Sequence, residues 1–380
     1  MAERSGVEIR LENVTKRYPG QEAPAVDGVT MTIPAGEIVV LVGPSGCGKS
    51  TLLRMINRLI EPTSGKITIG GQDALSINPD KLRRQIGYAI QQAGLFPHMT
   101  VAQNIAIVPG LLGWEQKRIT ERVDEMLELV GLDPEEYRGR YPRQLSGGQQ
   151  QRVGVARALA ADPPVLLMDE PFGAVDPITR GNLQDELLSL QTELQKTIVF
   201  VTHDFDEAVK LGDRIAVLGT RSKILQYDTP EVILASPADD TVAGFVGAGA
   251  SLKQLTLRRV RDVELGDVPT ALVTEPIDSV RQRFGSERGV IGLVLDTRRR
   301  PLRWITARDL SRATSLYQAG HPVEDTVSLQ STLHDALEAI LVSDEGLAVV
   351  TRRRGEYAGV VDIDTVITTI RELREEAVAP

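Results

Sequence analysis

A glycine-rich segment between a short apolar run and a helical pattern constrains the fold of this chain more than any other feature. The apolar run is Ile38–Val42, and the segment behind it consists of Gly43, Pro44, Ser45, Gly46, Cys47, Gly48, Lys49, Ser50 and Thr51. Apolar residues then recur at helical spacing, at Leu52, Leu53, Ile56, Leu59 and Ile60. This order predicts a strand, a tight loop and a helix that begins at the loop.

The residue types in this loop suit the binding of a nucleoside triphosphate. Gly43, Gly46 and Gly48 allow successive backbone N–H groups to converge on anionic oxygens without crowding. The helix that follows directs its partially positive N-terminus at the same place, and Lys49 adds a full charge. The hydroxyl of Ser50 is placed to bind Mg²⁺. We therefore expect a triphosphate and Mg²⁺ at this loop.

Composition limits what kind of protein carries this loop. The 380 residues, 42% of them hydrophobic, predict two or three domains, and the net charge of −9 argues against a broad nucleic-acid surface. The single cysteine, Cys47, leaves no disulfide within the chain and fits a reducing compartment. No run approaches the ~20 apolar residues of a membrane span, and residues 1–4 lack the apolar core of a signal peptide. We expect a soluble chain unless a partner holds it at a membrane.

Apolar runs and turns along the first 200 residues predict an α/β fold. From Val7 to about Ile69, short strands alternate with glycine turns, which indicates a small β-rich layer around the loop. Val165–Met168 and Thr197–Val201 are continuous apolar runs, typical of parallel strands buried on both faces. Between them, helical spacing predicts the crossover helix that parallel strands need, at Leu183, Leu187, Leu190 and Leu194.

Two carboxylates end one of these predicted strands. Asp169 and Glu170 directly follow Val165–Met168, and strand alternation directs their side chains differently. Asp169 would hold the Mg²⁺ shell through water, and Glu170 would polarise the attacking water. Two acidic residues that merely end a strand are the simpler alternative, and the presence of the other motifs weighs against it.

A second anion site is predicted at another helix start. Ser146, Gly147, Gly148 and Gln149 precede a helical pattern, and this site brings no lysine of its own. Two copies of the chain paired head to tail explain both sites, because the loop at Lys49 of one copy and the Ser146 turn of the other then enclose one ATP.

Together these motifs make the chain resemble the nucleotide-binding subunit of an ATP-binding-cassette (ABC) transporter, over roughly residues 7–247. The resemblance implies that Tyr18 stacks on adenine, that Gln91 joins Mg²⁺ and communicates with a membrane subunit, and that His203 contacts the γ-phosphate. It implies a catalytic set of Glu170, His203 and Lys49. Asp176 matches a further loop of the family, although the usual Ser-Ala-Leu-Asp is Gly173-Ala174-Val175-Asp176 here.

The implied fold is a P-loop NTPase domain over residues 1–247, with a RecA-like parallel-sheet core, an antiparallel β layer and a helical signature subdomain. The chain has one cassette, no long coiled-coil insertion and no fused membrane helices, which favours an importer subunit that docks on separate membrane proteins. Gly94–Thr100 would lie in the docking face. The resemblance implies integral-membrane permeases and an extracytoplasmic solute-binding protein as partners, at the cytoplasmic side of the inner or plasma membrane.

The C-terminal half contains a weak repeat. Thr297–Arg300 follows one apolar run and Thr351–Arg354 follows another, each before a second apolar stretch, which predicts two copies of a strand, charged turn, strand and helix. Residues 251–376 resemble a tandem α+β cystathionine-β-synthase (CBS) domain, with repeats at about 253–315 and 321–376. A cassette with this domain resembles the ATPase of osmoprotectant importers for glycine betaine, carnitine, choline or proline.

The CBS resemblance also implies a regulatory nucleotide contact. Thr306 and Asp309 match the ribose contact of that family, whereas Val361 is expected to replace the hydroxyl in the second copy. The two arginine turns, Thr297–Arg300 and Thr351–Arg354, are either solvated or bind anionic lipid or a dinucleotide phosphate. Two other functions stay open: a soluble CBS-regulated ATPase without a transport role, and an importer ATPase for another small amine or amino acid.

Overall fold

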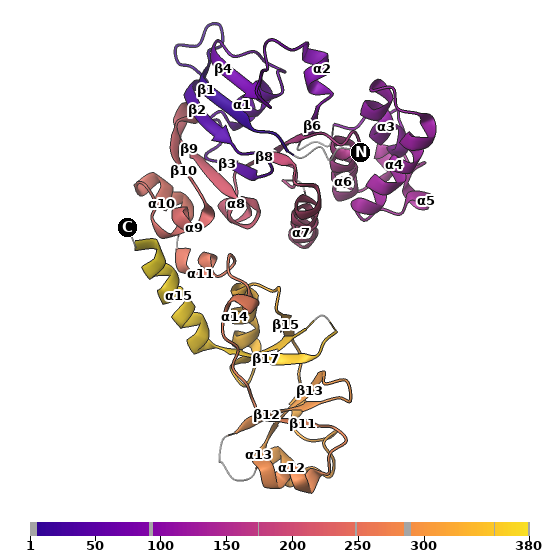
Figure 1. The fold of residues 1–380 in the computed structure, drawn as a ribbon, viewed down its shortest axis with the longest axis vertical. Helices are drawn as coiled ribbons and strands as arrows, with labels where there is room; N and C mark the ends of the chain where they lie inside the picture. The colour runs from indigo at the N-terminus through magenta and orange to yellow at the C-terminus, as the bar shows by residue number, and fades with distance from the viewer. Residues whose placement is uncertain are drawn as a thin grey trace. The chain divides into compact units, whose positions relative to one another are not determined.

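The computed structural model describes residues 6–90, 94–173, 175–247, 249–284, 290–352 and 354–378 (Figure 1). The chain divides into two compact units. Unit 1 comprises Met1–Ile233 with Pro237–Val246, and unit 2 comprises Leu234–Ser236 with Gly247–Pro380.

Unit 1 contains an antiparallel sheet built from the N-terminal segment, which confirms the expected β-rich layer. Its strand order is β2-β1-β4-β5, with β1 at Ile9–Lys16, β2 at Val26–Ile33, β4 at Ser64–Ile69 and β5 at Gln72–Asp73. Inward residues of β1 and β2 are buried and alternate with exposed ones, as a sheet with one solvated face requires.

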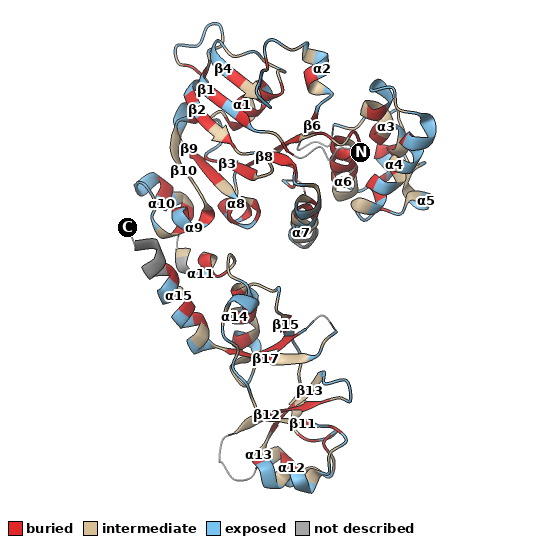
Figure 2. Cartoon of the chain, viewed as in Figure 1, coloured by how far each residue is buried: buried red, intermediate tan, exposed pale blue. Residues whose placement is uncertain are grey.

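The second sheet of unit 1 has six strands in the order β10-β9-β3-β8-β7-β6, and all neighbouring pairs except β10 with β9 are parallel. Every residue of β3 and β8 is buried, as expected for parallel strands covered on both faces (Figure 2). The crossover helix α7, Pro177–Leu194, joins β7 to β8 as predicted. The strands are β3 Ile38–Val42, β6 Ile86–Ile90, β7 Val165–Asp169, β8 Thr197–Thr202, β9 Arg214–Leu218 and β10 Ile224–Asp228.

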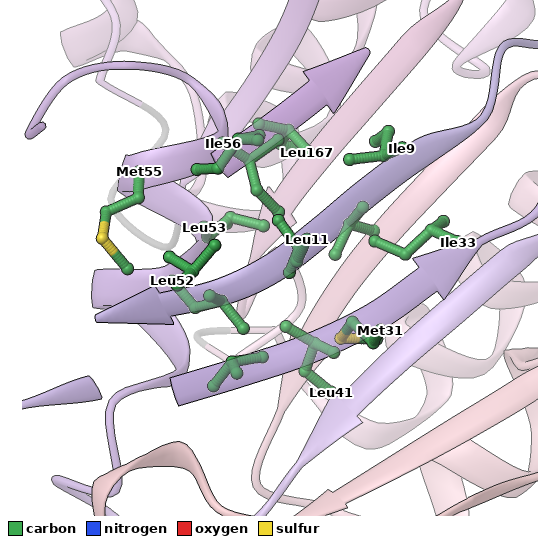
Figure 3. Close-up of a cluster of buried hydrophobic side chains, with 14 of the residues drawn as sticks. Ile9, Leu11, Met31, Ile33, Leu41, Leu52, Leu53, Met55, Ile56 and Leu167 are labelled. Carbon is green, nitrogen blue, oxygen red and sulfur yellow. The ribbon is translucent and has the colours of Figure 1, made fainter. Parts of the chain in front are cut away.

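Helix α1, Lys49–Ile56, packs with both sheets in one hydrophobic cluster. Figure 3 shows side chains of α1 meeting those of β1, β2, β3 and β7. The expected helical pattern extends to Ile60, but the helix ends at Ile56 because Arg58 has a positive φ of 48°. Leu59 is consequently 47% exposed and lies outside the buried face.

One group of helices gathers at the β6 edge of the larger sheet (Figure 1). Helix α6 packs on β6, and α3 and α4 pack on α6 and on each other. This group is the helical subdomain implied by the signature motif, with α3 Val101–Leu111, α4 Gln116–Leu129, α5 Pro134–Tyr137, the 3-10 turn η1 Pro142–Gln144 and α6 Gly147–Leu159. The other helices of the first 246 residues are α2 Pro79–Arg83, α8 Phe205–Leu211, η2 Thr220–Ser222, α9 Pro230–Ala235 and α10 Asp240–Val246.

Unit 2 contains two copies of a strand, helix, strand, strand and helix unit. In each copy the first strand pairs in parallel with the second, and the second pairs antiparallel with the third. The first copy is β11 Thr270–Leu272, α12 Ile277–Phe284, β12 Ile291–Leu295, β13 Pro301–Thr306 and α13 Ala307–Arg312. The second is β15 Thr326–Ser328, α14 Leu333–Val342, β16 Leu347–Thr351, β17 Tyr357–Asp362 and α15 Ile363–Val378. Shorter elements are α11 Ala250–Gln254, η3 Val260–Asp262 and β14 His321–Pro322, which pairs with β13.

The strand register corrects the interpretation of the second copy. Thr306 pairs with the first residue of β12, and Asp362 pairs with the first residue of β16, so Asp362 is the counterpart of Thr306. Val361 was therefore the wrong residue to compare. The hydroxyl and the carboxylate of the first copy have exchanged positions in the second copy. There Asp362 stands at the position of Thr306, and its Oδ1 accepts hydrogen bonds from the N–H and the hydroxyl of Thr365, at 2.8 and 2.7 Å.

No helix in the described parts of the chain combines the length and apolar character needed to cross a bilayer.

Candidate nucleotide site

The glycine loop takes the conformation that its residue types permit. Gly46 and Gly48 have positive φ values of 78° and 111°. A Cβ on Gly48 would lie 2.3 Å from Ser222 Oγ, which excludes any larger residue without a shift of its surroundings. Ser222 is buried, and both its N–H, at 2.6 Å, and its hydroxyl, at 3.0 Å, donate to the carbonyl of Cys47. The η2 turn therefore holds the loop from behind.

Lys49 lies inside the loop rather than in solvent. Its side chain is buried, and Nζ donates to the carbonyls of Gly43 at 2.6 Å and Pro44 at 3.0 Å. Pro44, Ser45 and Gly46 are exposed at the rim of the loop. The ammonium group is thereby fixed beside the N-terminus of α1, where its charge adds to that of the helix dipole.

A pair of hard oxygen donors adjoins the loop. The hydroxyl of Ser50 donates to Asp169 Oδ1 at 2.8 Å, which brings the start of α1 to the end of β7. Burial raises the pKa of Asp169, while the Ser50 hydroxyl and the Arg54 and Lys49 charges act in the opposite direction. Among the described residues no three acidic, histidine or cysteine side chains converge as a metal cage. Two oxygen donors fit Mg²⁺, which usually keeps several waters and binds one or two protein groups plus substrate phosphates.

Glu170 and His203 meet at the carboxyl ends of β7 and β8. Glu170 has a positive φ of 48°, and its N–H donates to the carbonyl of Val201 at 2.9 Å. This turn brings Glu170 Oε2 to 3.3 Å from Nδ1 of His203. The carboxylate side chain is 24% exposed and the imidazole 61%, so both can be reached from solvent. Strained backbone of this kind often accompanies functional sites.

The Ser146 turn forms a separate helix start. Ser146 Oγ accepts from the N–H of Gln149 at 3.2 Å, and Gln149 Oε1 accepts from the N–H of Ser146 at 2.9 Å, which closes a capping box. The Gln149 amide also donates to the hydroxyl of Tyr137. Helix geometry leaves the N–H groups of Gly147 and Gly148 available to an external acceptor.

Three further predicted site residues have different surroundings. Tyr18 is half-buried in the turn after β1, with Lys16 Nζ 5.2 Å from its ring centroid. Asp176 is exposed, and its carbonyl accepts from the N–H of Arg180 at 2.8 Å. Thr51 is half-buried in the first turn of α1, and Gln91 lies outside the described residues.

Sequence reasoning missed polar residues that lie behind the glycine loop and near His203. Ser222 is one such residue, and a serine in an isolated turn gave no signal. Glu207 is another: it is buried, its carboxylate accepts a hydrogen bond from Gln184 Nε2 at 3.0 Å, and it lies in the first turn of α8, four residues after His203. Burial is the main cause that raises the pKa of Glu207, with the Thr202 and Gln184 hydrogen bonds opposing it.

Known proteins resemble this chain at several levels. Residues 26–173 match the family model described as ABC transporter. The osmoprotectant import ATP-binding protein OsmV of Salmonella typhimurium is 43% identical over 365 residues, which cover 94% of this chain and 95% of that protein. The glycine betaine uptake system ATP-binding protein YehX of Escherichia coli is 51% identical over 67% of this chain and 82% of its own length.

Another relative has a higher identity over a shorter part of the chain. The choline transport ATP-binding protein OpuBA of Bacillus subtilis is 57% identical over 63% of this chain and 62% of its own length. The solved structure titled "Dimeric Structure of MJ0796, a Bacterial ABC Transporter Cassette" is 38% identical, with a TM-score of 0.54, and covers 58% of this chain and 98% of its own. The motif geometry and these similarities lead to one conclusion: the chain belongs to the ABC transporter family, as one of its ATP-binding proteins.

Proposed function

We propose that this chain is the ATP-hydrolysing subunit of an importer for quaternary-amine osmoprotectants such as glycine betaine, carnitine, choline or proline. The observation that carries the proposal is the 43% identity to an osmoprotectant import ATP-binding protein across 94% of the chain, which includes unit 2 as well as the cassette. The relatives named for glycine betaine and choline support the same solute class.

In the proposed reaction, ATP is bound by the glycine loop and its γ-phosphate is attacked by water. Lys49 Nζ and the N-terminus of α1 compensate charge on the phosphates. Glu170 accepts a hydrogen bond from the attacking water and orients it, while His203 contacts the γ-phosphate. Mg²⁺, held by Ser50, Gln91 and the shell around Asp169, would supply further charge compensation when it is bound.

We propose that two copies of the chain enclose ATP head to tail. The Ser146 turn offers the N–H groups of Gly147 and Gly148 to a triphosphate, and Asp176 would lie at the same interface. The solved relative described as dimeric supports this arrangement. Closure of the pair on ATP would reorient the membrane subunits, and hydrolysis would release it.

The proposed partners are permeases at the cytoplasmic side of the membrane, together with an extracytoplasmic solute-binding protein. Phe96 supports a docking role for the segment Gly94–Thr100, because this large apolar side chain is 45% exposed and packs edge-on against His98. A short helix of a permease would bury it.

Unit 2 is proposed to regulate the ATPase as a tandem CBS domain with repeats at about 253–315 and 321–376, where Thr306 and Asp309 would contact a nucleotide ribose. Its two arginine turns meet, since the N–H of Tyr357 donates to the carbonyl of Arg299 at 2.9 Å and Arg300 packs by Gly355. The combined positive patch would attract an anionic lipid or a dinucleotide phosphate, and more weakly as salt rises. Changing the six arginines at positions 298–300 and 352–354 to Gln should flatten the dependence of transport-coupled ATPase activity on salt. An unchanged salt dependence would refute the proposed role of these arginines.

Co-purification and uptake test the transport function. The full-length chain should be recovered with multi-span membrane proteins, and vesicles that contain the complex and its solute-binding protein should accumulate labelled glycine betaine only with ATP. An active ATPase that co-purifies with no membrane protein would favour the soluble regulated ATPase. Uptake of a different amine or amino acid, with no competition by betaine, would show that the chain serves an importer for another small solute.

A further inference from the structure

Unit 2 contains a cavity of about 240 Å³ between its two copies. One side is formed by Trp304 of β13, in the first copy, and by His321 of β14, which pairs with β13. The other side is formed by the end of α14 and the loop before β16, in the second copy. The two copies share a hydrophobic cluster that includes Trp304, Val349 and Val360, so the cavity lies within one packed structure. Drug-sized pockets measure about 300–1,000 Å³, so this cavity suits a smaller molecule.

Negative charge dominates the lining. Four carboxylates line the cavity, from Glu324, Asp325, Asp344 and Glu345, and His321 is the only basic side chain among the described residues around it. The Glu345 side chain is 8% exposed, and its Oε1 lies 2.9 Å from His321 Nε2. This nitrogen is shielded from solvent, and the contact does not have the geometry of a hydrogen bond. Carboxylates brought together in a partly enclosed space favour a cation and repel phosphate groups.

The arrangement of these carboxylates indicates which kind of cation fits. No three acidic, histidine or cysteine side chains in the described parts of the chain are close enough to hold a metal ion, so the charges surround the cavity without meeting at one point. A quaternary ammonium group has diffuse charge and no N–H to satisfy, and it is attracted to aromatic rings. Trp304, which is 4% exposed, supplies such a ring in the wall.

We propose that this cavity binds a small quaternary ammonium cation. Its carboxylates set the sign of the charge and repel the phosphate of a nucleotide, and Trp304 contacts the methylated ammonium group. The ribose-contact residues do not line it, and Thr306 and Asp309 hydrogen-bond each other at 2.6 Å. If the proposed import function holds, the cavity would report the cytoplasmic concentration of a cationic cargo. Cation binding itself does not depend on that function.

Tryptophan fluorescence of the full-length chain tests the proposal without membrane subunits or transport. The chain has two tryptophans, so Trp114→Phe leaves Trp304 as the only reporter. Titration with choline should give a saturable change. Glycine betaine should bind more weakly because its carboxylate is repelled, and AMP, whose phosphate is repelled in the same way, should not displace choline. A failure of transport would leave this titration interpretable.

Charge-neutralising variants locate the site. Glu345→Gln with Asp344→Asn should weaken choline binding by about tenfold or more. Glu324→Gln with Asp325→Asn should have the same effect, and a folding defect is not expected because both residues are exposed. Glu338→Gln, on an exposed face of α14 outside the lining, is the matched control and should leave affinity unchanged. Absence of saturation, equal affinity in the folded acidic-site variants, or displacement of choline by AMP would overturn the proposal.

Discussion

Substituting Gly48 with alanine tests how tightly η2 constrains the glycine loop. A non-glycine residue in the left-handed region costs roughly 1–2 kcal/mol, and the φ of Gly48 is 111°. The added Cβ would also lie 2.3 Å from Ser222 Oγ and 2.7 Å from the carbonyl oxygen of Ala25. Forcing a methyl group into a packed site costs a further ~1–3 kcal/mol. We expect Gly48→Ala to lower the free energy of unfolding by roughly 2–5 kcal/mol, a large part of the ~5–15 kcal/mol typical of a protein.

Gly71→Ala is the matched control for this prediction. Gly71 also has a positive φ, 77°, but nothing lies within 4 Å of a Cβ there, so only the backbone cost of roughly 1–2 kcal/mol remains. Urea unfolding followed by circular dichroism gives both values. Adding Ser222→Ala to Gly48→Ala should recover part of the loss, because it removes the closest contact. Equal losses at Gly48 and Gly71 would refute the steric argument.

Three further predictions follow from the geometry. Glu170→Gln should reduce ATP turnover by about 10²–10⁴-fold with ATP affinity retained. Glu186→Gln, which removes a carboxylate of α7 near Arg152, should keep turnover. Phosphate release and nucleotide binding measure both properties. Burial raises the pKa of Glu207 above 4.5, so as pH rises the folded chain keeps the proton on this carboxyl group to higher pH than the unfolded chain does. The protonated group therefore contributes its full stabilisation below the pKa of the unfolded state. This contribution is lost as pH rises through the pKa of the folded state. The free energy of unfolding of Glu207→Gln, relative to that of the parent, should therefore increase with pH. A difference that stays constant with pH would contradict a raised pKa of Glu207. Thr306→Ala and Asp362→Ala should each lower the stability of unit 2 by about 1 kcal/mol in thermal unfolding, while Asp362→Thr with Thr365→Asp should restore the cap.

Patterns local in sequence predicted much of unit 1. The run before the glycine loop became β3, and the leucines at 183, 187, 190 and 194 became the crossover helix, because burial on both faces and helical periodicity leave direct marks in the sequence. The end of α1 was not predictable in this way, since the positive φ of Arg58 depends on its surroundings.

Contacts between distant segments were beyond sequence reasoning. The hydrogen bonds from Ser222 to Cys47 join residues 175 positions apart. The exchange of hydroxyl and carboxylate between Thr306 and Asp362 became visible only through strand register, because spacing alone aligned Val361 instead. The cavity beside Trp304 likewise combines side chains from both copies, which no single motif brings together.

The dimer that ATP closes is the central claim, and trapping it is the most direct test. Glu170→Gln should bind ATP without hydrolysing it, so light scattering of this full-length variant should show a mass twice that of the chain with ATP and a single mass without it. Crosslinking should then join the Gly147 turn of one copy to the Lys49 loop of the other. A single mass under saturating ATP, or a dimer whose Gly147 turns lie away from the nucleotide, would contradict the account.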